Sequence, residues 1–91
     1  MNLNFRDLRE QLEGDFYGVS TLESVERVRE KWMKVCELIY ESSQSKPQLS
    51  APDRAWRRAN AQILYYRLQV RYQRSLRVVG TAENIAEALS A

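Results

Sequence analysis

Apolar residues recur at helical spacing along most of this chain, and this periodicity limits the fold more than any other feature. Between residues 21 and 43 they fall on one face of a helix, with charged residues on the opposite face. The apolar residues are Leu22, Val25, Val28, Trp32, Met33, Val35, Cys36, Ile39 and Tyr40. Ser20 and Glu23 have the spacing of a capping box, which places the start of the helix here. We therefore predict a one-faced amphipathic helix.

The segment from Ala51 to Val79 carries apolar residues on two opposite faces of a helix. Ser50 is a good N-cap, Pro52 fits the first helical turn, and Gly80 is expected to end the helix. The first stripe consists of Ala61, Leu64, Tyr65, Leu68, Tyr72, Leu76 and Val79. The second stripe consists of Trp56, Ala59, Ile63, Tyr66 and Val70. A hairpin buries only one stripe, so the second needs the first helix, a second copy or a different protein as its cover.

Two shorter helical segments flank this pair. The first covers residues 4–13, with Asn4 as its expected N-cap and Gly14 as its expected end. Leu3 and Leu8 have the spacing of a hydrophobic staple. The last covers residues 81–90 and presents a small apolar face. A separate helix of about ten residues is not stable alone in water, so we expect it to dock or to fray.

The connecting segments complete the predicted fold. In the turn at residues 15–19 we expect Phe16 and Tyr17 to cover the end of the core. Residues 42–51, which include Pro47, are predicted to form a loop too short to divide the chain. We predict a single all-α domain over residues 1–91. It is a small helical bundle in which a long antiparallel helical hairpin carries short flanking N- and C-terminal helices.

The residue inventory argues against catalysis. The 91 residues include no histidine, and Cys36 is the only cysteine. Nucleophile systems that need histidine, metal sites rich in histidine or cysteine, and internal disulfides are therefore ruled out. Cys36 lies among apolar residues and is expected to be a buried, unreactive side chain. Glycine-rich nucleotide-binding loops are also missing from the sequence. We expect no enzyme activity, cofactor, metal or small-molecule substrate.

Hydropathy and the N-terminal residues bear on where the protein acts. No run of apolar residues approaches the roughly 18 that a membrane-spanning helix needs. The first residues do not have the basic and then apolar pattern of a signal peptide. We therefore expect a cytoplasmic protein that makes no contact with a membrane.

The formal net charge of +2 conceals a polarised chain. Residues 1–45 carry six basic and nine acidic side chains, whereas residues 46–79 carry eight basic and one acidic. The basic side chains of the second stretch are mostly arginine, which pairs well with carboxylate or phosphate. The candidates for phosphate contacts are Arg57, Arg58, Arg67, Arg71, Arg74 and Arg77. This segment therefore fits either acidic protein surfaces or a nucleic-acid backbone.

These observations favour a non-catalytic binding or assembly protein that works through helical surfaces. The expected partner is another protein, and in the first instance a second copy that forms a homodimer. The expected interface residues are Trp56, Ile63, Tyr66, Val70 and Arg67. The alternative is a small nucleic-acid-binding subunit that contacts the phosphate backbone through the arginine-rich helix.

Overall fold

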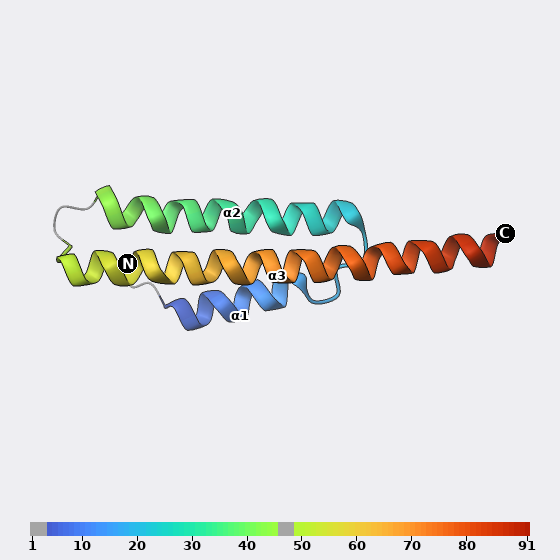
Figure 1. Cartoon of the computed structure of the whole chain (residues 1–91), viewed down its shortest axis with the longest axis horizontal. Coiled ribbons are helices and arrows are strands. Elements are labelled where there is room, and N and C mark those ends of the chain that lie inside the picture. The colour runs from blue at the N-terminus through green and yellow to red at the C-terminus, as the bar shows by residue number, and fades with distance from the viewer. Residues whose placement is uncertain (1–3, 46–48) are drawn as a thin grey trace.

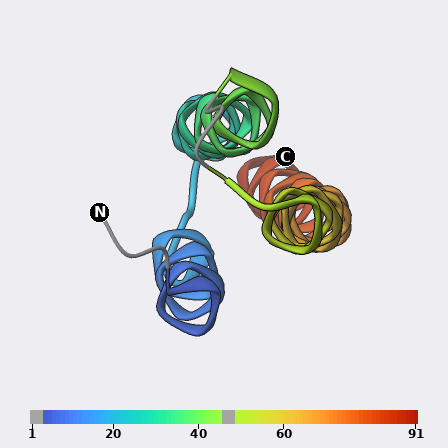
Figure 2. The same ribbon diagram turned by 90° about the vertical axis from the view of Figure 1, so that its left-hand side faces the viewer.

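The computed structural model describes residues 4–45 and 49–91, and these residues form three helices without any strand. The helices are α1 (Phe5–Phe16), α2 (Leu22–Ser45) and α3 (Ala51–Ser90). α2 and α3 run in opposite directions as a hairpin, and α1 lies along another side of α3 (Figures 1 and 2). The predicted all-α fold, with its long antiparallel hairpin and short N-terminal helix, is confirmed.

α1 is longer than its sequence pattern suggested. The Asn4 side chain accepts a hydrogen bond from the Asp7 backbone N–H, as expected of an N-cap. The helix then passes through Gly14, where we had placed its end, and finishes at Phe16. The glycine with a left-handed backbone is Gly18, at a φ of 77°. Extending the helix brings Phe16 into the core. The proposed staple involves Leu3, which lies outside the described residues.

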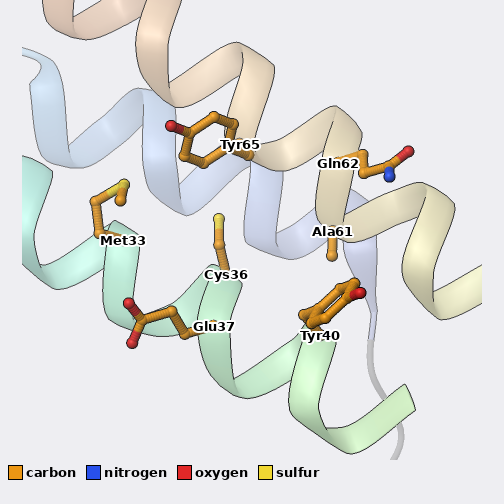
Figure 3. Close-up of a pocket in the computed structure, with 7 residues that line it drawn as sticks. All are labelled: Met33, Cys36, Glu37, Tyr40, Ala61, Gln62 and Tyr65. Atoms are coloured by element: carbon orange, nitrogen blue, oxygen red, sulfur yellow. The ribbon is translucent and has the colours of Figure 1, made fainter. Parts of the chain in front are cut away.

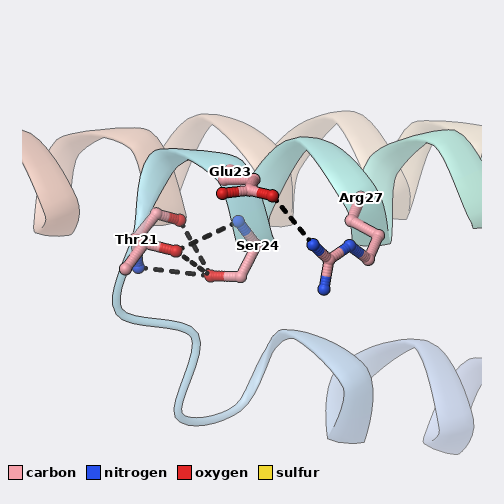
Figure 4. A network of polar contacts seen from close by, with 4 residues as sticks. All are labelled: Thr21, Glu23, Ser24 and Arg27. Atoms are coloured by element: carbon pink, nitrogen blue, oxygen red, sulfur yellow. Dashed lines mark hydrogen bonds and ion pairs between the residues drawn. The ribbon is translucent and has the colours of Figure 1, made fainter.

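α2 begins one residue later than predicted, with a different capping pair. The Thr21 hydroxyl accepts a hydrogen bond from the Ser24 backbone N–H, and the Ser24 hydroxyl accepts one from Thr21 (Figure 4). The expected box of Ser20 and Glu23 is therefore wrong, because Glu23 instead forms an ion pair of 3.0 Å with Arg27 one turn along. α2 also continues to Ser45, beyond the predicted end. Pro47 of the predicted loop lies outside the described residues.

α3 is one continuous helix of 40 residues, and this corrects the prediction of a break at Gly80. Gly80 does not adopt a positive φ, so its backbone continues the helix. A glycine permits a helix stop without imposing one. The predicted C-terminal helix at residues 81–90 is therefore the last part of α3, and all of it is exposed. It projects beyond the ends of the other two helices (Figure 1).

The core lies where the three helices meet, and Trp32 is its largest fully buried side chain. The Trp32 indole N–H donates a hydrogen bond of 2.8 Å to Asp15, which precedes the turn between α1 and α2. Lys31 donates a second bond of 2.7 Å to the same carboxylate oxygen. The expectation that Phe16 and Tyr17 both cover the core is half right. Phe16 is buried, but Tyr17 is exposed because the helix ends between them.

Polar contacts fix the register of the hairpin. The Tyr72 hydroxyl donates a hydrogen bond to Glu26, and the Arg29 guanidinium lies 5.0 Å from the centre of the Tyr72 ring. Toward the other end of the hairpin, Arg57 donates a hydrogen bond of 3.3 Å to Ser42. These contacts place the start of α2 beside the part of α3 around Arg77.

Candidate interaction surface on the third helix

The hairpin covers the two stripes of α3 unequally. In the first stripe Ala61, Leu64, Leu68 and Val79 are buried against α2 and α1, and Tyr72 and Leu76 pack at the edge of the core. In the second stripe Trp56, Ile63 and Tyr66 are 52%, 46% and 69% exposed. Val70 is half-buried. Most of the second stripe therefore remains open to solvent in the single chain.

α1 borders the second stripe and touches it at one end. The Phe5 and Trp56 rings meet edge to face, with ring centres 4.9 Å apart and an angle of 80° between them. Near the other end of α1, Glu13 forms an ion pair of 2.9 Å with Arg71 of α3. α1 is thus held beside the stripe at both ends without covering the middle of it.

The open part of the second stripe and an arginine row share one groove between α1 and α3. We define the arginine row as Arg67, Arg71 and Arg74. The groove has a volume of about 360 Å³. Its lining residues are Glu13, Ile63, Tyr66, Arg67, Val70, Arg71 and Arg74. An apolar strip of Ile63, Tyr66 and Val70 is therefore bordered by cationic side chains.

The remaining candidates lie apart from this groove. Trp56 lies at the far end, against Phe5, and Arg57 faces α2 through its bond with Ser42. Arg58 and Arg77 are exposed but do not line the groove. The candidate arginines therefore do not form one continuous basic surface. The chain gathers three of the six candidates into one place, and one of those three, Arg71, already has a carboxylate partner.

A second groove lies between α2 and α3, and the sequence patterns had not predicted it. It has a volume of about 280 Å³ and is lined almost entirely by apolar atoms. Its residues are Met33, Cys36, Glu37, Tyr40, Ala61, Gln62 and Tyr65 (Figure 3). We had assigned Tyr40 and Tyr65 to the buried faces of their helices, but both are partly exposed at the rim of this groove.

Cys36 lies at the base of this second groove. Its side chain is buried, as the sequence predicted, and burial raises the pKa of the thiol to about 11. A thiol with this pKa is almost fully protonated at neutral pH, and the protonated form is a poor nucleophile. The geometry gives Cys36 a packing role.

The described part of the chain meets neither the requirements of a metal site nor those of a membrane-spanning helix. Across residues 4–45 and 49–91, no three or more acidic, cysteine or histidine side chains come together as a potential metal site. Over the same ranges, none of the helices combines the length and apolar character needed to cross a bilayer.

The chain matches no known protein-family model, no curated protein and no solved structure. Its function therefore has to be inferred from its own residues.

Proposed function

We propose that this protein is a non-catalytic binding and assembly protein that acts through the groove between α1 and α3. The observation that carries this proposal is the exposure of Ile63 and Tyr66 in the middle of a long helix. A contiguous apolar strip with an aromatic side chain is the type of surface that protein partners cover. The first partner we assign is a second copy of the chain.

The composition of the groove supports a helical protein partner. Ile63, Tyr66 and Val70 are spaced three and four residues apart, so another helix can lie along them. Arg67 and Arg74 are exposed at the border, where they can pair with acidic side chains of the partner. Glu13 is the one acidic residue that lines the groove, and it already pairs with Arg71, so the acidic partners of Arg67 and Arg74 have to come from another part of the second copy.

The test is the molar mass in solution, measured by light scattering over a concentration series. We expect a species heavier than the 10.7 kDa of the single chain. Replacing Ile63→Asp together with Tyr66→Asp should reduce that mass, because two charges would enter the apolar strip. A mass unchanged by this double substitution would contradict the proposal.

Leu38→Asp is the matched control for that experiment. Leu38 is 52% exposed, close to the value for Ile63, but it lies on α2 and lines neither groove. We expect this substitution to leave the mass unaltered. Thermal unfolding of each variant separates loss of association from loss of folding.

Nucleic-acid binding is the second candidate function, and one observation favours it. Two arginines of the row, Arg67 and Arg74, are exposed and line the same groove as Tyr66. Cationic side chains next to an aromatic ring can hold a phosphate backbone and a base together. The ion pair of Arg71 with Glu13 opposes this function, because it neutralises one of the three cations.

A further inference from the structure

The last part of α3 projects from the bundle without any cover. α2 begins beside the part of α3 around Arg77, so the residues that follow have no neighbour on that side. Residues 81–91 are all exposed. We call this segment the tail (Figure 1). Most helices owe their stability to packing of an apolar face, so an isolated extension of this length needs a partner to stay ordered.

An apolar seam with coiled-coil spacing runs from Val78 into the tail. The seam residues are Val78, Ala82, Ile85 and Leu89, at intervals of four, three and four. Val78, Ile85 and Leu89 are 65%, 55% and 84% exposed. The only charged side chains of the tail, Glu83 and Glu87, lie outside the seam on the helical wheel. The seam is therefore an uncharged apolar stripe that has no partner among residues 4–45 and 49–91.

The seam continues the side of α3 that α1 covers. Arg71 and Val78 are seven residues apart and so share a face of the helix. Arg71 contacts Glu13 near the end of α1, and the same face is open beyond that point. A helix that pairs with the seam would therefore follow α1 along α3 without displacing it.

We propose that the tails of two copies pair in antiparallel orientation through this seam. In that arrangement Val78 of one copy lies opposite Leu89 of the second copy, and Ala82 lies opposite Ile85. Every layer thus combines a smaller with a larger apolar side chain, and the seam is complementary to itself. The flanking positions are Thr81, Ala86 and Ala88, which add no charge and allow the two helices to approach closely.

The end of α1 sets the extent of the overlap. In the next longer heptad register the second tail would reach past Arg71 of α3. Glu13 of α1 already contacts Arg71 on this face, so α1 blocks such a register. The pairing of residues 78–89 covers about 18 Å of helix. An interface of this length falls below about 1,200 Å², so the tails form a weak and reversible pair.

This tail interface is separate from the groove between α1 and α3, and the two can be tested independently. Two different self-pairing surfaces on one chain build assemblies larger than a dimer. We call the chain that carries Ile63→Asp and Tyr66→Asp the groove variant. In this variant we expect pairing through the tail alone. The limiting mass at high concentration should then approach twice 10.7 kDa.

Adding Ile85→Asp and Leu89→Asp to that variant should return the mass to 10.7 kDa at all concentrations. The tail residues make no contact with the core, so thermal unfolding of the hairpin should not change. If the groove variant is already monomeric at every concentration, or if the tail substitutions leave its mass unaltered, tail pairing is overturned. Neither result bears on the groove, whose own test compares wild type with the groove variant.

Disulfide crosslinking tests the antiparallel register directly. Val78→Cys and Leu89→Cys are introduced separately into a Cys36→Ala background, because Cys36 is the only other cysteine. Mixing the two variants should give a crosslinked heterodimer, since the two positions face each other. Each variant alone should crosslink poorly, because its two cysteines would be about 16 Å apart along the helices. Crosslinked homodimers of the single variants, without a crosslinked heterodimer in the mixture, would overturn the antiparallel pairing.

Discussion

At the scale of single residues, Asp15 joins the end of α1 to the middle of α2. Its carboxylate accepts hydrogen bonds from Lys31 and from the indole of Trp32. The bond with Lys31 is the main reason that the pKa of Asp15 lies below its ordinary value of 3.8, and burial opposes this effect. Because Trp32 is fully buried, this carboxylate also satisfies the only polar atom of the largest core side chain.

Replacing Asp15→Asn should lower the free energy of unfolding by about 0.5–1.5 kcal/mol at pH 7. The amide oxygen can still accept the indole bond, so the loss comes from the ion pair with Lys31. Since the pKa of Asp15 is lower in the folded chain than in the unfolded one, its contribution is complete above about pH 4. It disappears as the pH falls through the folded pKa. Urea unfolding of both proteins at pH 7, 5 and 3 measures this difference.

Glu10→Gln is the control for Asp15, because Glu10 forms an exposed ion pair of 3.4 Å with Arg6. An ion pair exposed to this extent contributes little, so we expect a change below about 0.5 kcal/mol. A deficit of Asp15→Asn that stays the same between pH 7 and pH 3 would show that the charge of Asp15 is not its source.

At the scale of helices and turns, Gly80 and Gly18 differ in backbone conformation. Gly80 lies within α3, and a methyl group added there would meet no atom within 4 Å. Gly18 ends the turn after α1 with a left-handed backbone. A side chain at the first position suits the helix, whereas a side chain at the second is strained.

Gly80→Ala should therefore raise helicity and increase stability by about 0.5–1 kcal/mol, whereas Gly18→Ala should reduce stability by about 1 kcal/mol. Circular dichroism at 222 nm and urea unfolding measure the two effects. If Gly80→Ala destabilised the protein, α3 would have to break at this glycine, as its sequence had suggested, and the tail would be a separate helix.

At the scale of the whole molecule, the elongated shape affects every measurement of association. The chain extends over 62 × 19 × 18 Å and has a radius of gyration of 16.7 Å. A compact chain of this length has a radius near 12 Å. A monomer will therefore elute early from a size-exclusion column and resemble a dimer. Light scattering, which reports mass independently of shape, is the appropriate method for both interfaces.

Salt dependence separates the two candidate functions of the arginine row. If the row binds phosphates, affinity should fall steeply as the salt concentration rises. The triple variant with Arg67→Gln, Arg71→Gln and Arg74→Gln should then show a shallower slope of log affinity against log salt, by about 0.7–0.9 for each phosphate that is no longer neutralised. Association of apolar strips needs no such dependence. Binding to heparin and to short nucleic acids at several salt concentrations measures it. A wild-type protein that binds neither at physiological salt would eliminate the nucleic-acid function.

The sequence was sufficient to predict the helical segments 21–43 and 51–79 and the two apolar stripes of the second segment. Helical periodicity and capping act over three or four residues, so a single sequence contains the necessary information. The same local rules located the N-caps at Asn4 and Ser50, which the structure confirms. They failed at Gly14 and Gly80, because glycine tolerates both a helix and its end.

Only the tertiary structure decided which surfaces are covered. The spacing of apolar residues predicted two stripes on α3. The packing of α2 and α1 buries most of the first stripe and leaves the middle of the second exposed. The ion pair of Glu13 with Arg71 and the bond of Asp15 with Trp32 also join residues far apart in the chain. Their existence depends on where α1 lies against the hairpin. Local preferences determine helices and their faces, whereas burial depends on which faces meet, and that is a property of the whole folded chain.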